Sequence, residues 1–164
     1  MKKIIFVCLG NICRSPLAQA MMEKIIRDEN ADDRYLVDSS GTGSWHVGSR
    51  SDARMIKTGE KYDLKMDHLA KQLAPEHGEA FDYLFMMDRQ NYRDALKIVD
   101  KKHHQKIYLF RNFDTISDSL DVPDPYYGGS EGFENVYQIV KRNCQILFSL
   151  IEKEAIKKEK KPNI

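Results

Sequence analysis

Four short apolar segments, separated by helical patterns, constrain the fold of this chain more than any other feature. The first is Ile4-Ile5-Phe6-Val7, and comparable segments run over 83–87 and 107–110, with a weaker one over 35–39. The first segment is continuously apolar rather than alternating, which is typical of a strand that is covered on both faces of a parallel sheet. The apolar run stops at Gly10-Asn11 and no small-residue cleavage site follows, so it is interpreted as a strand and not as a signal peptide.

The segments between these strands have helical periodicity. One helix is expected after Ser15-Pro16, where proline suits the first turn, a second begins near Ala53, and a third spans about 91–101. The last helix shows one apolar face, made of Phe133, Val136, Tyr137, Val140, Cys144, Leu147 and Ile151. Strands that alternate with helices predict an α/β fold of three layers, with a small parallel sheet between helices on both faces.

Composition excludes several classes of protein. The chain has 164 residues, of which 41% are hydrophobic and 31% charged, so we expect a single folded domain over 1–155. The lysine-rich tail over 156–164 is expected to be solvated; the alternative is that it binds an acidic partner. A net charge of +1 gives no electrostatic reason to expect nucleic acid, and no segment is apolar enough for a membrane span. Three cysteines, an odd number, favour a reducing, cytoplasmic compartment.

The segment 8–15 carries the chemistry. It joins the first strand to the first helix, at the carboxyl edge of the sheet, where ligands bind in folds of this kind. A short loop before a helix N-terminus directs backbone N–H groups at one point, and Gly10 and Asn11 tolerate the positive φ that such a turn needs. Arg14 adds a planar set of donors suited to two phosphate oxygens. The loop therefore predicts an anion site.

Cys8 would lie at the floor of this anion site. Positive potential from the N–H groups, the helix and Arg14 favours its thiolate at neutral pH. A lone cysteine that ends an apolar strand is usually only a small buried hydrophobe, but here it begins a Cys-x5-Arg loop between a strand and a helix. A thiolate directed at a bound phosphate indicates nucleophilic attack on phosphorus.

Transfer from a phosphate ester also needs a proton donor for the leaving oxygen. The segment 121–129 is rich in proline and glycine, follows the last strand, and should fold over the same edge of the sheet. Asp124 lies between two prolines in a stiffened backbone, which makes it the candidate acid. On composition alone, Asp121 and Asp118 remain alternatives, and an ordinary turn aspartate is the simpler interpretation of each.

At this point the sequence resembles the low-molecular-weight protein tyrosine phosphatase family. The resemblance extends from Val7 to about Leu150 and rests on four motifs: VCLGNICRSP at 7–16, DSSGTGSWHVG at 38–48, FDYLFMMDRQN at 81–91 and DPYYG at 124–128. It implies a four-stranded parallel sheet and a cytoplasmic hydrolase that removes phosphate from protein tyrosines. No cofactor or metal is expected, and phosphate or sulfate should bind in the loop.

The resemblance also implies the roles of individual residues. Cys8 would be the nucleophile that forms a phosphocysteine, Arg14 would bind the phosphoryl oxygens, and Asp124 would be the general acid and then the base. The phosphate-binding loop would comprise Leu9, Gly10, Asn11, Ile12, Cys13, Arg14 and Ser15. The supporting polar residues would be Asn11, Ser15, Ser39 and His68, with a solvent-facing loop histidine as the alternative for His68.

Substrate choice follows from the mouth of the site. By resemblance, the substrate pocket would be formed by Ile12, Trp45, Tyr126 and Tyr127. Related bacterial enzymes that act on phosphoarginine carry threonine at the position of Ile12, so the bulkier Ile12 favours phosphotyrosine. Packing elsewhere is the alternative role for Trp45. Lys71 stands where the family commonly has arginine, and it is left out of the predicted site.

Cys13 is close enough in sequence to pair with Cys8. The family implies a reversible Cys8–Cys13 disulfide that protects the nucleophile from irreversible oxidation. A passive packing thiol is the alternative for Cys13, and Cys144 is expected only in the core. An arsenate reductase is disfavoured because no cysteine lies between Cys13 and Cys144. A binding module without turnover is disfavoured because Cys8 and Asp124 are present. We expect a monomer or a weak dimer with phosphotyrosine proteins as substrates.

Overall fold

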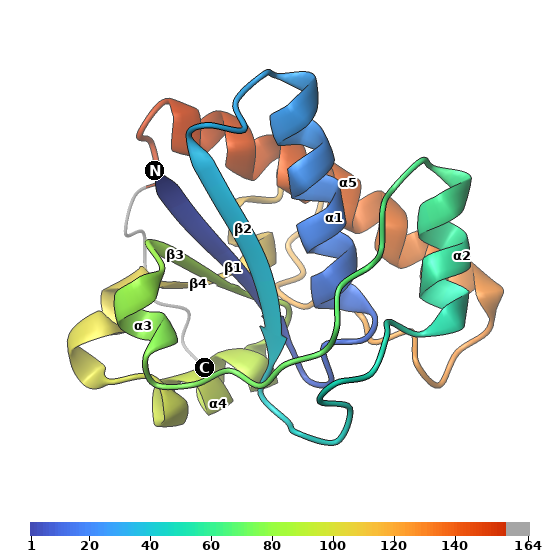
Figure 1. Cartoon of the computed structure of the whole chain (residues 1–164), viewed down its shortest axis with the longest axis horizontal. Helices are drawn as coiled ribbons and strands as arrows, with labels where there is room; N and C mark the ends of the chain where they lie inside the picture. The colour runs from blue at the N-terminus through green and yellow to red at the C-terminus, as the bar shows by residue number, and fades with distance from the viewer. Residues whose placement is uncertain (157–164) are drawn as a thin grey trace.

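A parallel sheet of four strands forms the central layer of the computed structural model, which describes residues 1–156 (Figure 1). The strand order is β2-β1-β3-β4, and every neighbouring pair is parallel. The strands are β1 (Lys2–Cys8), β2 (Tyr35–Gly41), β3 (Tyr83–Met86) and β4 (Ile107–Leu109). The first strand therefore lies inside the sheet, as its continuously apolar sequence predicts.

Helices cover both faces of this sheet. The α-helices are α1 (Arg14–Asp28), α2 (Ala53–Lys61), α3 (His77–Ala80), α4 (Arg89–Ile98) and α5 (Ser130–Glu152). Two 3-10 helices, η1 (Lys101–Lys106) and η2 (Phe110–Phe113), flank β4. Helices α1 and α5 lie on one face and α3 and α4 on the other, while α2 packs beside α5 (Figure 1). The predicted α/β fold, with a four-stranded parallel sheet between two layers of helices, is confirmed.

Strand β1 separates two hydrophobic cores. Ile4 and Phe6 face α1 and α5, whereas Ile5 and Val7 face the helix α4 side. All four side chains are 0% exposed. Successive strand residues point to opposite faces of a sheet, so a strand buried on both faces needs an unbroken apolar run.

Several boundaries differ from those that the sequence predicts. Helix α4 begins at Arg89 because the carboxylate of Asp88 caps it, accepting a hydrogen bond of 2.7 Å from the Asn91 N–H. The helix ends at Ile98 and not at residue 101, because Val99 is extended. Strand β4 ends at Leu109, so Phe110 belongs to η2 instead.

The C-terminal segment consists of a long helix and a lysine-rich tail. Helix α5 begins at Ser130, before the first apolar residue of its predicted face. The lysine-rich tail predicted over 156–164 lies outside the described residues, except for Ile156, which is half-buried and packs against the core. Among residues 1–156, no helix combines the length and apolar character that crossing a bilayer requires.

The carboxyl edge of the sheet brings distant segments together. Cys8 at the end of β1 is paired with Gly41 at the end of β2, and Val7 is paired with Met86 at the end of β3. The backbone N–H of Val122 donates to the carbonyl of Met87 at 2.8 Å, which places the segment after η2 at this edge as well. This convergence positions the site described next.

Candidate active site

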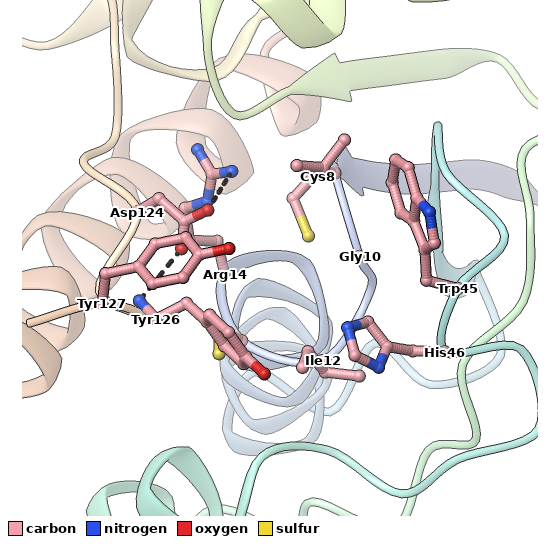
Figure 2. A pocket seen from close by; sticks show the side chains of 11 residues that line it. Cys8, Gly10, Ile12, Arg14, Trp45, His46, Asp124, Tyr126 and Tyr127 are labelled. Carbon is pink, nitrogen blue, oxygen red and sulfur yellow. Dashed lines mark hydrogen bonds and ion pairs between the residues drawn. The ribbon is translucent and has the colours of Figure 1, made fainter.

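A cavity of about 390 Å³ opens at this edge, where β1 passes into α1. It is lined by Cys8, Leu9, Gly10, Ile12, Cys13, Arg14, Trp45, His46, Asp124, Tyr126 and Tyr127. Figure 2 shows the Cys8 sulfur directed between two walls, with Asp124 and the two tyrosines on one side and Trp45 and His46 on the other. Residues from three separate segments of the chain thus meet around one sulfur atom.

The Cys8 sulfur is held by polar groups of its own loop. The Ser15 hydroxyl lies 3.0 Å from it, and the Asn11 backbone N–H donates to it at 3.3 Å. A hydroxyl and a backbone N–H can both donate a hydrogen bond to a sulfur atom. Helix α1 begins directly beside the sulfur, and its N-cap residue Cys13 provides no side-chain cap, so the free N–H groups of the first turn stay available at this end.

Close packing against β2 fixes the shape of the loop. Asn11 has a φ of 55°, in the left-handed region that asparagine tolerates. A Cβ at Gly41 would lie 2.6 Å from the Leu9 carbonyl oxygen, so only glycine permits this approach. The backbone N–H groups of Thr42 and Gly43 donate to the carbonyls of Cys8 and Leu9, each at 2.9 Å.

A buried polar network braces the loop through the Asn11 side chain. Its amide nitrogen donates to the hydroxyls of Ser15 (2.8 Å) and Ser39 (3.0 Å). Its oxygen lies 2.8 Å from Nε2 of His68 and accepts from the backbone N–H of Lys71 at 3.0 Å. Of the four residues predicted to support the loop, Ser15, Ser39 and His68 therefore all contact the fourth, Asn11. Asn11 is only 1% exposed, so in the folded protein its amide group bonds to these four partners instead of to water.

Arg14 is the buried cation of the site, with 2% of its surface exposed. Its Nη1 donates to the Asp88 carboxylate at 2.6 Å and to the Val122 carbonyl at 3.0 Å, and its Nη2 lies 3.5 Å from Asp124. Burial opposes its charge, but the neighbouring Cys8 and Asp88 raise the pKa of Arg14 overall. Its guanidinium is thus held in one orientation before any ligand arrives.

Of the three candidate acids, only Asp124 lines the cavity. Its Oδ1 accepts a hydrogen bond of 3.1 Å from the Tyr126 N–H, and the second oxygen faces Arg14. The Asp121 carboxylate is instead bound by the guanidinium of Arg89, at 2.9 Å from Nη2. Asp118 is exposed on the preceding loop and does not line the cavity.

Aromatic side chains form the rim of the cavity. Trp45 is 72% exposed, and its ring lies against Gly43, where a Cβ would come within 1.9 Å of the indole. Tyr126 and Tyr127 meet edge to face with ring centroids 4.9 Å apart, and Tyr127 is 92% exposed. Ile12 is buried in the wall. All four residues of the predicted substrate pocket line the cavity (Figure 2).

Three residues at the site are missing from the sequence-based prediction. Asp88 lies two residues after the end of β3 at the carboxyl edge, and that position is the available signal. His46 follows Trp45 in one of the quoted motifs and lies 6.2 Å from Tyr126 between ring centroids. Lys71 supports the loop through its backbone N–H, while its side chain pairs with Asp38 at 2.6 Å. A backbone contact carries no residue-type signal in the sequence.

The three cysteines are free thiols in this structure, and all are buried. Burial, with Asp52 nearby, raises the pKa of the Cys13 thiol, which lines the cavity beside Cys8. Burial likewise raises the pKa of Cys144, which lies in the core on α5, as its position on the apolar face predicts. Within residues 1–156, no group of three or more His, Cys, Asp or Glu side chains is arranged to hold a metal ion.

Comparison with known proteins assigns the fold and the site to a family. The sequence model of the family described as "Low molecular weight phosphotyrosine protein phosphatase" matches residues 3–161. A protein of that name from Schizosaccharomyces pombe is 40% identical over 150 residues, which cover 90% of this chain and 96% of the relative. The human protein of the same name is 37% identical, covering 88% of this chain and 92% of its own length.

Solved structures agree with this assignment. A protein tyrosine phosphatase from Entamoeba histolytica, with Hepes in its active site, superposes with a TM-score of 0.92 at 38% identity, covering 95% of this chain and all of its own. Wzb from Vibrio vulnificus, in complex with benzylphosphonate, superposes with a TM-score of 0.79 at 25% identity, covering 90% of this chain and 97% of its own. The family that the four motifs predict is confirmed: the chain belongs to the low molecular weight phosphotyrosine protein phosphatase family.

Proposed function

We propose that the chain hydrolyses phosphotyrosine in proteins, and small aryl phosphates, through a phosphocysteine on Cys8, with Asp124 as general acid and then base. As a member of its family it is a protein tyrosine phosphatase that uses a cysteine. One observation carries the assignment of roles: the Cys8 sulfur, the Arg14 guanidinium and the Asp124 carboxylate line the same cavity, each brought there by a different element.

The first step transfers the phosphoryl group to sulfur. The Cys8 thiolate attacks phosphorus from the floor of the cavity as the bond to the phenolic oxygen breaks, and that oxygen takes the proton of Asp124. Negative charge spreads over the three equatorial oxygens in the transition state. The rigid guanidinium of Arg14, held at 2.6 Å by Asp88, and the N–H groups at the start of α1 are suited to stabilise this charge.

The second step regenerates the enzyme. Asp124, now a carboxylate, takes a proton from a water molecule, and the water oxygen attacks the phosphorus of the phosphocysteine. The sulfur leaves as a thiolate, and inorganic phosphate is released. The Ser15 hydroxyl, 3.0 Å from the sulfur, can donate to this thiolate as it forms, and Asn11 holds the hydroxyl in place.

The rim supports a preference for an aryl ester. A phosphotyrosine ring can lie between the aromatic side chains of Trp45 and Tyr126, whereas phosphoserine is too short to bring its phosphate to the sulfur while its backbone clears the rim. Ile12 offers no hydroxyl to a guanidinium, which disfavours phosphoarginine. Two structural relatives hold Hepes and benzylphosphonate, a sulfonate and a phosphonate, so phosphate or sulfate is the expected anion here.

Removing the nucleophile tests the proposal. The variant Cys8→Ser should lose turnover of an aryl phosphate by a factor on the order of 10³ or more, yet still bind phosphate. The matched control is Cys144→Ala, which removes a thiol from the core, far from the cavity, and should remain active. Turnover that persists in Cys8→Ser would show that another group is the nucleophile. Peptides with phosphotyrosine, phosphoserine and phosphoarginine, compared without added metal, test the specificity.

We also propose that Cys13 protects the nucleophile. Peroxide oxidises the Cys8 thiolate to a sulfenic acid, and attack by the Cys13 sulfur then releases water and forms a disulfide. The raised pKa of Cys13 leaves it a thiol at neutral pH, which makes Cys13 the slower of the two sulfurs to react with peroxide when Cys8 is the nucleophile. Three free, buried cysteines are consistent with a cytoplasmic protein.

A further inference from the structure

The loop that carries Asp124 is anchored well on one side only. Upstream, Val122 is fixed by hydrogen bonds to the Met87 carbonyl and from Arg14, and Asp121 by Arg89. Between Val122 and the start of α5, the segment 123–129 forms one wall of the cavity through Asp124, Tyr126 and Tyr127 (Figure 2). Among residues 1–156, hydrogen bonds from other elements reach this segment from two side chains: Arg14 contacts Asp124, and Arg54 of helix α2 contacts Tyr126.

Arg54 is itself fixed to the phosphate-binding loop. Its Nε and Nη2 donate to the two oxygens of Asp52, at 3.0 and 2.8 Å. The Asp52 carboxylate also caps α2, accepting from the Arg54 backbone N–H at 2.8 Å, and its own backbone N–H donates to the Ile12 carbonyl at 2.8 Å. A bidentate pair of this kind holds a guanidinium in one plane. The position of Arg54 is therefore set by the loop that surrounds Cys8.

The same guanidinium holds Tyr126, which in turn holds Asp124. Nη2 of Arg54 donates to the Tyr126 carbonyl at 3.0 Å. The guanidinium carbon of Arg54 lies 5.5 Å from the ring centroid of Tyr126 and 4.7 Å from the ring centroid of Phe133. The Tyr126 backbone N–H donates to Oδ1 of Asp124 at 3.1 Å (Figure 2). The carbonyl and the N–H of one residue thus join Arg54 to the acid.

We infer that Arg54 is a positioning residue that holds Asp124 over the cavity through Tyr126. The inference rests on the proposed function, because it needs Asp124 to be the acid. Arg14 alone draws the Asp124 carboxylate toward the cation that must bind phosphate, at 3.5 Å. The contact from Arg54 reaches the other carboxylate oxygen through Tyr126, so that the carboxyl group is also held by a group other than the phosphate-binding cation. Proton transfer depends on such placement more than on the strength of the acid.

The predicted signature is a loss that depends on the leaving group. Arg54→Met keeps an unbranched side chain that covers the apolar stem but removes the charge and the donors. With a phosphotyrosine peptide, whose phenolic oxygen needs the proton, kcat/KM should fall about tenfold. With p-nitrophenyl phosphate, whose oxygen leaves as a stable anion, it should fall less than about twofold. The quantity kcat/KM is used because it reports the transfer to sulfur and not the later hydrolysis.

Two further variants complete the experiment. Lys57→Met is the matched control, since Lys57 is exposed one turn further along the same face of α2, and both kcat/KM values should match those of the wild type. Asp52→Asn keeps a residue that can cap α2 but removes the charge that orients Arg54, and it should show the same selective loss at about threefold. The inhibition constant of inorganic phosphate should change less than twofold in all three, as expected if the phosphate-binding loop is intact.

The outcomes separate this inference from the proposed function. A selective loss in Arg54→Met and Asp52→Asn, absent from Lys57→Met, supports it. Equal losses with both substrates, no loss with either, or an equal effect of Lys57→Met would overturn the role of Arg54. If Arg54→Met does not fold, the ratio of the two kcat/KM values in Asp52→Asn decides. Failure of the proposed function would look different, because Cys8→Ser would remain active or the wild type would not act on phosphotyrosine.

Discussion

Replacement of Asn11 should reveal how much the loop depends on one side chain. Its amide group makes four hydrogen bonds inside the protein, to the hydroxyls of Ser15 and Ser39, to the ring of His68 and to the Lys71 N–H. A hydrogen bond contributes about 1 kcal/mol to the free energy of unfolding, so Asn11→Ala loses about 4 kcal/mol from these contacts. Alanine at a φ of 55° adds about 1 kcal/mol of backbone strain.

A glycine variant separates these two contributions. Asn11→Gly loses the same four hydrogen bonds, but glycine adopts positive φ without strain. Its greater freedom in the unfolded chain offsets part of this relief, since glycine costs about 0.4–1 kcal/mol there. We therefore expect Asn11→Gly to be more stable than Asn11→Ala by at most about 1 kcal/mol, and both to be about 4–5 kcal/mol less stable than the wild type.

The chain offers a matched control at Asn30. This residue has a φ of 53°, almost that of Asn11, but an exposed side chain. Asn30→Ala should show the strain alone, about 1 kcal/mol. Urea unfolding at a fixed pH, followed by circular dichroism, measures the stability of the wild type and the three variants, and the inhibition constant of phosphate reports whether the loop is intact. If Asn11→Ala costs no more than Asn30→Ala, the hydrogen-bond network does not stabilise the loop.

Three further predictions concern the acid, the second thiol and a buried ion pair. Asp124→Asn should lower kcat/KM about a hundredfold for a phosphotyrosine peptide and much less for p-nitrophenyl phosphate, and equal losses would exclude Asp124 as the acid. After treatment with peroxide, the wild type should recover activity with a dithiol, whereas Cys13→Ser should not; equal recovery would exclude a protective disulfide. The hydrogen bond from Arg142 lowers the pKa of Asp114, a fully buried carboxylate, so its stabilisation is present above the unfolded pKa of about 4 and is lost as the pH falls. Asp114→Asn should reduce the free energy of unfolding by about 3 kcal/mol at pH 7 and flatten the loss of stability below pH 4, which denaturant titrations across pH would measure.

The sequence predicts the parts of the site that lie within a few residues of one another. Residues 8–15 contain the nucleophile, the arginine and the turn residues, and their place between an apolar strand and a helix indicates an anion site. Asp124 was one of three candidates after the last strand. The motif DPYYG at 124–128 favours Asp124, and the folded chain separates it from Asp121 physically, because the guanidinium of Arg89 binds the Asp121 carboxylate outside the cavity.

Helix boundaries were less predictable than the strands. The start of α4 depends on the Asp88 cap, whose carboxylate also binds Arg14, 74 residues earlier in the chain. A periodic pattern of apolar residues indicates which face of a helix is buried, but it does not indicate at which residues the helix begins and ends. The third helix was therefore predicted two residues late and extended past its end.

By itself, the sequence determined the strand-loop-helix unit that carries Cys8 and Arg14, because apolar periodicity and turn chemistry act over short stretches of chain. The tertiary structure alone decided which distant groups orient that unit and the loop of the acid: Asp88 binds Arg14, His68 binds Asn11, and Arg54 binds Tyr126, across 74, 57 and 72 residues. Such contacts depend on the order and register of the parallel strands, which bring the ends of separate segments to one edge. No local pattern in the sequence indicates which of these distant residues will be in contact.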